Sequence, residues 1–280
     1  MTASADLVTT VVVTRDRWPD LRRSLPHHTG PVVLVDNASE DGTARLVRDG
    51  FPRVEVIELP ENRGAAGRNA GVGAARTPYV AFADDDSWWA PGALDRAARL
   101  LAAHPRLALV AGRVLVGDDE ELDPTCRAMA ASPLPREPDL PGPSILGFIA
   151  CGAVVRRDAY LEAGGFDDVV FFPGEEERLA LDLAARGWGL AYVDGLVVHH
   201  HPSPARDRGA RRALVARNRV LTAVMRRPWS VVARLVVALA RDGSAGVRGV
   251  AQAVPRLPGA LRARRPLPAR VERQRRMLGR

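Results

Sequence analysis

The chain has 280 residues, of which 46% are hydrophobic, so it can bury the core of one large domain or of one domain with an appendage. Its two cysteines, Cys126 and Cys151, are too few and too isolated for a disulfide framework or a metal cluster, which favours a reducing cytoplasm. All 40 basic residues are arginine, and this excludes chemistry that depends on lysine.

Charge is divided unevenly along the chain. Residues 205–280 hold 20 arginines against three acids, a net charge of +17, so residues 1–204 carry −10 to give the overall +7. Residues 1–6 lack the basic region and apolar run of a signal peptide, and no stretch reaches the ~20 apolar residues that span a bilayer. We therefore expect an acidic body with a basic tail, and neither a secretion signal nor a membrane span.

Apolar runs alternate with helical patterns through the first 116 residues. Strands are expected at residues 7–14, 31–36, 54–59, 79–83 and 107–116, and helices at 17–25, 39–47, 65–75 and 91–103. This alternation predicts a parallel, doubly wound α/β sheet. Such sheets bind ligands beyond the carboxyl ends of their strands, where Asp36 and Asp84–Asp86 fall.

The pattern changes after residue 116. Residues 117–144 carry acids and then six prolines, and this segment is too long for an ordinary connection, so we expect a mobile or functional loop. Order is expected again at residues 145–155, with helices at 158–163 and 174–186 and strands at 190–193 and 196–198. The last of these strands runs into His199–His201.

The chain is therefore divided into three parts. Residues 1–204 are expected to form the α/β domain and residues 205–254 an amphipathic helical extension with arginines between its apolar positions. Four prolines between residues 255 and 268 predict that the basic tail, residues 255–280, is partly disordered.

Three adjacent acids, Asp84, Asp85 and Asp86, follow the expected strand at residues 79–83. They repel one another unless a cation or hydrogen-bond donors neutralise them. Hard oxygen ligands of this kind suit Mg²⁺ or Mn²⁺ that carries a substrate phosphate. The alternative is an acidic turn that caps the following helix.

Several motifs, in their order and spacing, resemble those of family 2 inverting glycosyltransferases with the GT-A fold, over roughly residues 7–204. They lie at residues 11–15, 33–43, 62–71, 84–86, 165–167 and 175–177. The resemblance is to bacterial rhamnosyl- and galactofuranosyl-type transferases. It implies the transfer of a sugar from a UDP-, dTDP- or GDP-linked donor to a hydroxyl of a glycan or lipid-linked acceptor, in cell envelope polysaccharide synthesis.

The resemblance assigns residues to the donor. Thr14 falls on the donor side, and Asp36 corresponds to the acid that binds the pyrimidine base, although it is also placed to cap the next helix. Arg68 would reach the diphosphate as a charged donor, the alternative being a solvated helix face. Asp84 or Asp85 would contact the ribose.

The resemblance also assigns metal ligands. Asp86 would hold the metal, and His199 is the preferred third ligand, with His201 second. Alternation along an extended segment places His199 and His201 on one face and His200 on the other. The alternative is one packed histidine with two exposed neighbours.

The second half of the reaction needs a base for the acceptor hydroxyl. The resemblance implies Glu176, preceded by Glu175, and neighbouring carboxylates should raise its pKa towards a useful base strength. The alternative is an acidic first turn that complements the helix dipole. The family's acid and arginine after the base are exchanged here as Arg178 and Asp182, which are neighbours at i and i+4, so the ion pair should survive reversed.

The acceptor side is less sharply marked. Trp88 and Trp89 suit stacking on a sugar or lipid but are equally suited to a core, and Glu175 lies beside the base. Gly152 belongs to a segment, residues 147–152, that resembles the family's acceptor-side strand. Cys151 in that segment suits small packing rather than a nucleophile.

The basic C-terminal region suits contact with an anionic membrane surface, which implies a position at the inner face of the cell membrane. Its alternative is an ordinary helix pair that covers the domain, with its charge facing water. Nucleic acid is not expected, because no nucleic-acid-binding motif accompanies the charge.

Two rival functions are open. A sugar-1-phosphate nucleotidyltransferase shares the sheet but needs a glycine-rich loop and a lysine after its first strand, and residues 14–19 provide neither. A catalytically silent, membrane-associated relative would lack the metal acids or the base, and both are present.

Overall fold

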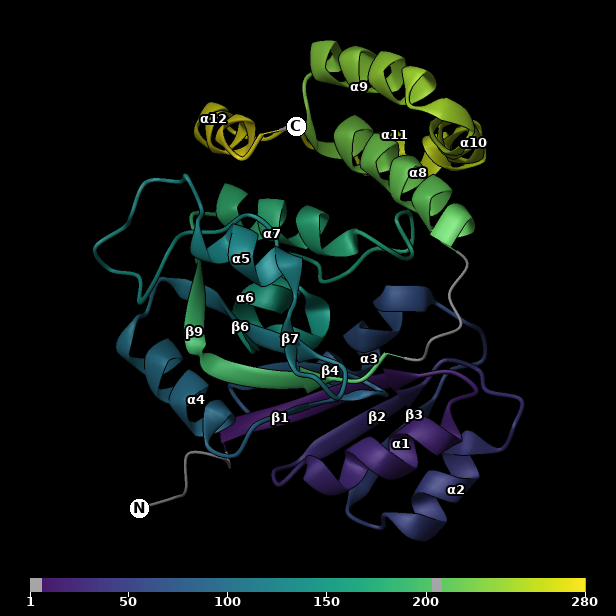
Figure 1. The fold of residues 1–280 in the computed structure, drawn as a ribbon, viewed down its shortest axis with the longest axis vertical. Coiled ribbons are helices and arrows are strands. Elements are labelled where there is room, and N and C mark those ends of the chain that lie inside the picture. The colour runs from purple at the N-terminus through teal and green to yellow at the C-terminus, as the bar shows by residue number, and fades with distance from the viewer. Residues whose placement is uncertain (1–6, 203–207, 280) are drawn as a thin grey trace.

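The computed structural model describes residues 7–202 and 208–279 (Figure 1). Its centre is a nine-stranded sheet with the order β3-β2-β1-β4-β8-β6-β9-β5, and β7 pairs with β6. The strands are β1 (Val8–Thr14), β2 (Val32–Asp36), β3 (Val54–Glu58), β4 (Tyr79–Asp84), β5 (Ser87–Trp89), β6 (Leu107–Val116), β7 (Glu121–Leu122), β8 (Ala153–Arg156) and β9 (Gly189–His200).

The first four strands are parallel, as the alternating pattern predicts. In the register of β1 with its neighbours, Thr14 pairs with Asp36 and Val13 pairs with Asp84. The carboxyl ends of β2 and β4 therefore meet at one edge of the sheet. This brings the two predicted acidic sites, which are about fifty residues apart in sequence, to the same edge.

The second part of the sheet is mixed. β8 is antiparallel to β4 and β6, β9 is parallel to β6, and β5 is antiparallel to β9. β5 was not predicted, and the two strands predicted at 190–198 are one strand with a register shift on β6. The pairing of Ser87 with His200 and Trp88 with His199 places the histidines beside the turn that carries the acids.

Adjacent residues of a strand point to opposite faces of the sheet, and both faces are buried along β1, β2 and β4. Val12 packs with Leu21 and Val47 of α1 (Trp18–Ser24) and α2 (Thr43–Gly50) on one face. Val11 packs in the main core on the other face. That core also takes residues from α3 (Arg68–Ala74), α4 (Ala93–Ala103), α6 (Arg157–Glu162) and α7 (Glu175–Ala185).

The segment 117–144 departs from its prediction as a loop. It contains β7 and the helix α5 (Pro124–Ala130), whose Asp123 side chain accepts a hydrogen bond from the Thr125 N–H at 2.7 Å. Cys126 and Met129 of this helix are buried in the main core. Pro124 stands at the start of the helix, where proline is favoured, so it begins an element instead of breaking one.

Five helices follow the α/β domain and form a lobe above α7 (Figure 1). They are α8 (Arg208–Arg226), α9 (Trp229–Arg241), α10 (Gly243–Ala253), α11 (Leu257–Arg262) and α12 (Ala269–Met277). Leu221 and Met225 of α8 are buried in a separate apolar cluster of this lobe. None of the described helices combines the length and the apolar character required to cross a membrane.

The tail predicted to be partly disordered is helical over most of its described length. Pro258 lies in the first turn of α11 and Pro268 caps α12, positions at which proline favours a helix. Val271 of α12 is fully buried, and Glu272 accepts a hydrogen bond from Arg227, the residue that follows α8. The prolines here separate helices rather than mark disorder. The predicted boundary at residues 204 and 205 lies outside the described residues.

Candidate active site

The acidic cluster begins where β4 ends. Asp85 and Asp86 form the tight turn into β5, and the Ser87 hydroxyl accepts a hydrogen bond from the Asp84 N–H at 2.8 Å. Asp86 is 5% exposed and Asp84 is half-buried. Because the turn reverses the chain within a few residues, the three carboxylates point to three different sets of partners.

Asp85 is held by the end of β1. Its Oδ2 accepts a hydrogen bond from the Thr14 hydroxyl at 3.1 Å, and its Oδ1 is 3.8 Å from Arg17 Nε. Burial raises the pKa of Asp85 to about 7, with further contributions from the charges of Asp86 and Asp84, against the lowering effects of Arg17 and Thr14. Thr14, predicted on the donor side, therefore fixes a member of the acidic turn.

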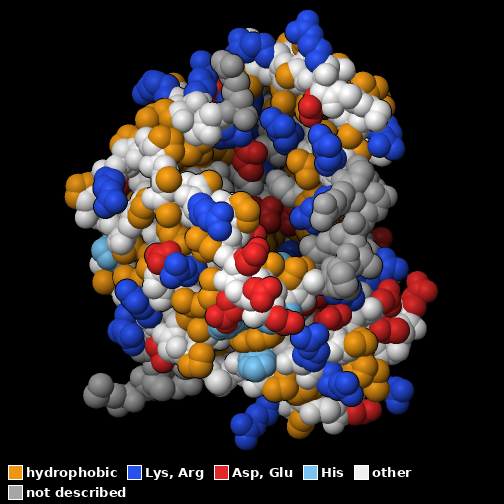
Figure 2. Space-filling model, viewed as in Figure 1, with side chains coloured by type: hydrophobic (Ala, Val, Ile, Leu, Met, Phe, Trp, Pro, Cys, Tyr) orange, Lys and Arg blue, Asp and Glu red, His pale blue; other side chains and the backbone are white. Residues whose placement is uncertain are grey.

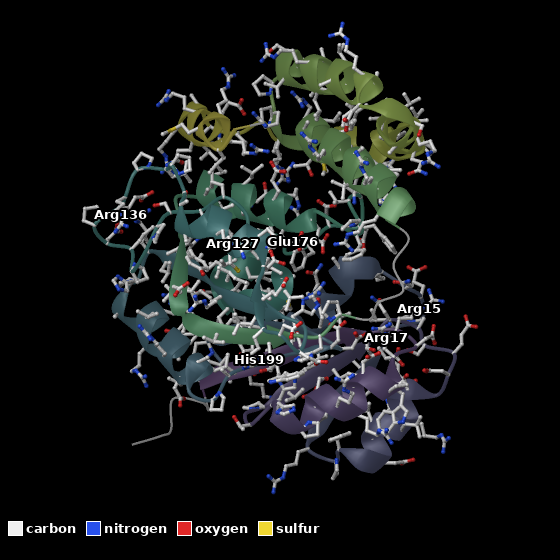
Figure 3. All side chains as sticks on the ribbon, viewed as in Figure 1. Arg15, Arg17, Arg127, Arg136, Glu176 and His199 are labelled. Carbon is white, nitrogen blue, oxygen red and sulfur yellow. The ribbon has the colours of Figure 1, made fainter. Side chains whose placement is uncertain are left out.

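Asp86 faces the histidine strand. Its Oδ1 is 3.3 Å from His200 Nε2, and its Oδ2 is 3.7 Å from Arg17 Nη2. Arg17 was not predicted as a site residue. It stands directly after β1, at the same sheet edge, and Figure 3 shows it there.

His200, rather than His199, is the histidine that contacts the acidic turn, through Asp86. His199 Nδ1 is 3.0 Å from Glu120, and its ring stacks on Trp88 at 5.7 Å. His201 lies on the same side, with its ring 4.9 Å from Trp88. The predicted alternation of the three histidines is therefore confirmed, and it is the face of His200, not that of the predicted ligands His199 and His201, that meets Asp86. The pairing of His200 with Ser87, next to Asp86, explains the difference.

A candidate metal site lies among these groups. Ligand atoms of Asp84, Cys151 and His200 lie within 4.8 Å of one another. Burial and the charges of Asp84 and Asp86 raise the pKa of the Cys151 thiol well above its usual value, and a soft sulfur ligand does not suit Mg²⁺ or Mn²⁺. The remaining carboxylate oxygens and imidazole nitrogen form a donor set that suits Mn²⁺ or Mg²⁺, so these residues fit such an ion.

Asp36 lies at the end of β2 and is 2% exposed. Its Oδ1 accepts hydrogen bonds from the Ser39 N–H at 2.9 Å and from the Ser39 hydroxyl at 2.5 Å. Both bonds end on one oxygen, which leaves Oδ2 for a further donor. Asp36 thus closes the turn that follows β2 and does not cap the next helix, α2, whose N-cap is Gly42, and it keeps acceptor capacity at the sheet edge.

Arg68 connects the two acidic parts of the site. It is 4% exposed, so the alternative of a solvated helix face is wrong, and its Nη2 donates to Asp84 Oδ1 at 2.5 Å. Burial alone would lower the pKa of Arg68, but the charges of Asp84, Glu175 and Glu176 outweigh it and raise the pKa. One guanidinium therefore lies between the metal-side acids and the first turn of α7.

Glu175 and Glu176 begin α7 (Figure 3). Glu175 is 2% exposed, and neither of its carboxylate oxygens has a hydrogen-bond partner among the described residues. Burial, and then the charge of Glu176, raise its pKa well above the usual range. Burial also raises the pKa of Glu176, against backbone hydrogen bonds and Arg68. The predicted direction of the shift is confirmed, but burial is a larger cause than the neighbouring charges.

The exchanged ion pair forms as predicted. Arg178 Nη1 donates to Asp182 Oδ2 at 2.5 Å, and both residues are buried. Asp182 also accepts two hydrogen bonds from Arg226 of α8, at 2.5 and 2.9 Å. The exchange of signs thus places an acid where it anchors the C-terminal lobe, and the sequence of α7 alone carries no signal for that partner.

The residues predicted on the acceptor side divide into two groups. Trp89 is 4% exposed and donates to the Phe82 carbonyl at 3.1 Å, so it is a core aromatic. Gly152 is also buried, and a Cβ there would lie 2.7 Å from Val114, so packing rather than substrate approach requires glycine. Trp88 is half-exposed, and its ring stacks on those of His27 at 4.4 Å and His201 at 4.9 Å.

The model of the glycosyl transferase family 2 matches residues 10–164, which include β1 to β8 and the acidic turn. The chain belongs to this family. The pre-mycofactocin glycosyltransferase of Mycobacterium tuberculosis is 34% identical over an alignment of 221 residues. This alignment covers 74% of this chain and 45% of that protein. The N-acetylglucosaminyl-diphospho-decaprenol L-rhamnosyltransferase of the same organism is 26% identical over 253 residues, 76% of this chain and 82% of that protein. This family 2 chain therefore spans about half the length of the first relative and most of the second.

The fold of this family 2 chain is GT-A. It is similar to a mannosyltransferase from Pyrobaculum calidifontis solved with GDP-Man and Mn²⁺, with a TM-score of 0.59 at 21% identity. The match covers 97% of this chain and 84% of that one, so it extends beyond the residues that the family model matches.

Proposed function

We propose that the chain is a metal-dependent, inverting glycosyltransferase that moves a sugar from a nucleotide diphosphate to a hydroxyl of a glycan or lipid-linked acceptor. The observation that carries the proposal is the position of Arg68, which bonds to Asp84 while its charge interacts with Glu175 and Glu176. One guanidinium thus bonds to a donor-side acid and also responds to the charge of the candidate base. Membership of family 2 and the Mn²⁺-bound mannosyltransferase neighbour support this function.

On the donor side, Asp36 accepts a hydrogen bond from the base, and Asp84 or Asp85 contacts the ribose. Asp86 and His200 hold the metal, with Asp84 next to them. A bound divalent ion supplies charge that stabilises the departing nucleoside diphosphate. Arg68, already charged and buried, adds hydrogen-bond donors to the same diphosphate.

On the acceptor side, Glu176 takes the proton of the attacking hydroxyl. The oxygen forms a bond to the anomeric carbon while the bond from that carbon to the phosphate oxygen breaks, and the nucleoside diphosphate leaves with the electron pair. Attack from the face opposite the leaving group inverts the anomeric carbon. The raised pKa of Glu176 suits this role, because a stronger base accepts a hydroxyl proton more readily.

We further propose that the C-terminal lobe rests on an anionic membrane surface at the inner face of the cell membrane. Large apolar side chains are exposed on its helices at Trp229, Val237, Val247, Val254 and Leu261. Arginines stand between them, and Figure 2 shows basic side chains spread over this end of the molecule. Exposed apolar groups combined with arginine are typical of helices that lie on anionic lipid.

A donor panel tests the enzymatic proposal. UDP-, dTDP- and GDP-sugars are screened with Mn²⁺, with Mg²⁺ and with a chelator, and both slow hydrolysis of the donor and the melting temperature are measured. At least one donor should stabilise the protein and be hydrolysed only when the metal is present. A protein that no donor stabilises with either metal would not be this enzyme.

A further inference from the structure

A cavity of about 640 Å³ lies between the first turn of α7 and helices α8, α9 and α12. Its volume is in the range typical of small-molecule sites. Figure 2 shows the molecule hollowed below the C-terminal helices, with basic side chains around the hollow and acidic side chains at its floor. The charged side chains that line the cavity are Glu177, Arg219, Arg227, Arg234, Arg275 and Arg276.

The cavity has an excess of positive charge. Glu272 accepts bonds from Arg227 at 2.6 and 3.0 Å and from Arg276 at 2.8 Å, and Glu177 is 2.5 Å from Arg275. Five guanidinium groups thus meet two carboxylates. Arg219 and Arg234 have no carboxylate partner among the described residues. A site with this balance attracts an anion, and guanidinium groups bind phosphate oxygens with paired hydrogen bonds.

Thr222 provides an independent indication of a ligand. This residue of α8 lines the cavity and is 3% exposed, and its hydroxyl has no hydrogen-bond partner among the described residues. Buried hydroxyls in folded proteins are nearly always bonded. The Thr222 oxygen is itself buried, so a rotation of this side chain towards the cavity would let it donate to a phosphate oxygen there. The arginines alone do not explain why this hydroxyl has no partner.

One wall of the cavity is apolar. Val231, Leu235 and Ala238 of α9 line it at intervals of four and three residues, which place them on one face of the helix. A ligand that fits both walls therefore has an anionic head and an apolar chain.

The cavity also borders the candidate base. Glu177 forms part of its wall, and Glu176 is the preceding residue of the same helical turn. The donor diphosphate, in contrast, belongs at the end of β4 with the acidic turn. An anion in the cavity is therefore placed on the acceptor side of the reaction.

We propose that this cavity binds the phosphate groups of a lipid-linked acceptor, a prenyl diphosphate that carries a sugar, with Thr222 and the arginines on the phosphates and the α9 wall along the first part of the chain. This inference rests on the proposed function and names the class of its acceptor. A phospholipid headgroup shares the phosphate chemistry, so the test separates the two sources.

The test measures binding rather than transfer. Farnesyl diphosphate, inorganic pyrophosphate and phosphatidylglycerol vesicles are titrated into the full chain by calorimetry. The variants are Thr222→Val, which keeps the shape but removes the hydroxyl, and the double variant Arg219→Gln/Arg234→Gln. Matched controls are Arg212→Gln on α8 and Arg241→Gln on α9, exposed arginines of the same helices that do not line the cavity.

Farnesyl diphosphate should bind the unchanged protein more tightly than pyrophosphate, and both cavity variants should weaken it at least tenfold while the controls do not. Thermal unfolding of Thr222→Val should be unchanged, which separates lost contacts from a lost fold. Farnesyl diphosphate binding that is equal in all variants would overturn the proposal. Loss of vesicle binding alone would make the cavity a headgroup site and would overturn it as well.

The same titrations keep this inference apart from the proposed function. UDP and GDP with Mn²⁺ are titrated into each variant, and their binding should not change. If no nucleotide binds the unchanged protein while farnesyl diphosphate binding still depends on Thr222, the donor chemistry is wrong and the cavity assignment stands. If nucleotides bind but farnesyl diphosphate does not, the cavity assignment is wrong and the donor chemistry stands.

Discussion

The sheet edge and the contact between α7 and the C-terminal lobe use charge in opposite ways. At the sheet edge, three adjacent carboxylates share few cationic partners, and burial together with its neighbours raises the pKa of Asp85. In the contact with the lobe, Asp182 is bonded to both Arg178 and Arg226. Carboxylates that outnumber the arginines facing them attract a metal and a substrate, whereas charges that pair completely hold two parts of the protein together.

This comparison predicts that an acid removed from the sheet edge costs function and an acid removed from the lobe contact costs stability. The five experiments below are arranged from the largest expected effect to the smallest.

The largest effect is expected for Asp86→Ala. It removes the carboxylate beside His200, so metal-dependent nucleotide binding should be lost. Because the metal neutralises the charge of the nucleotide's phosphates, its affinity should fall by at least about 100-fold. Calorimetry with UDP or GDP and Mn²⁺ measures it. Asp119→Ala, which removes an exposed acid, is the control. Retained metal-dependent binding in Asp86→Ala would exclude Asp86 as a ligand.

Glu176→Gln separates binding from chemistry. Donor binding should be unchanged, because the amide keeps the shape, while kcat for transfer should fall by about 10²- to 10⁴-fold through loss of the base. Glu175→Gln should cost less, since its raised pKa already favours the neutral form that glutamine mimics. Transfer that survives in Glu176→Gln and is lost in Glu175→Gln would reverse the two roles.

Asp182→Asn tests the lobe contact. It leaves Arg178 and Arg226 buried without their shared carboxylate, which should cost about 3–5 kcal/mol in the free energy of unfolding, measured with urea. Asp49→Asn is the matched control, because its i,i+4 pair with Arg45 is exposed and should contribute less than about 0.5 kcal/mol. Equal losses in the two variants would mean that the buried contact does not hold the lobe.

The pH dependence of transfer sharpens the role of Glu176. Burial raises its pKa, so the carboxylate that accepts the proton is lost as the pH falls through this raised value, and kcat should decline on an acid limb that lies above pH 4.5. Glu176→Gln should remove this limb. The buried Glu175 also has a raised pKa in the folded protein, but its pH dependence runs the other way. Its contribution to stability is full below the unfolded pKa and is lost as the pH rises through the folded pKa. Glu175→Gln should therefore raise the melting temperature at neutral pH.

The smallest effect is expected at the membrane surface. Val237→Ser/Val247→Ser removes two exposed apolar side chains of α9 and α10 and should weaken binding to phosphatidylglycerol vesicles several-fold, as expected for two small apolar groups. Leu161→Ser changes an exposed apolar residue of α6 and should have no effect. Equal vesicle affinity for all three proteins would argue against contact through the lobe.

The same contrast explains what the sequence could predict. The strands and the acids at their ends follow from local sequence patterns. The position of Asp36 and Asp84–Asp86 at one edge of the sheet could therefore be predicted from the sequence. The choice among the three histidines was not, because it depends on how β9 pairs with β5, and β5 has three residues and no clear local pattern. Only the pairing decides which face of β9 meets Asp86.

The C-terminal lobe was predicted as helices, and a helix pair that covers the domain was the alternative to membrane contact, but its partners on the domain could not be predicted. Arg226 lies 44 positions from Asp182 and Glu272 lies 45 positions from Arg227, and no periodicity links residues at such separations. The prolines of the tail were interpreted as signs of disorder because their meaning depends on position, and Pro258 and Pro268 stand at helix starts. The arginines were visible in the sequence, but whether they face lipid, a cavity or a buried acid is set by tertiary contacts.

The central claim is that one sugar lies between the metal held by Asp86 and the carboxylate of Glu176. A crystal structure of the protein with Mn²⁺ and a donor from the panel tests it most directly, with anomalous scattering to locate the metal. The account predicts manganese bonded to Asp86 and His200, with the anomeric carbon open to Glu176. Manganese bound elsewhere, or a sugar separated from Glu176 by protein, would contradict it.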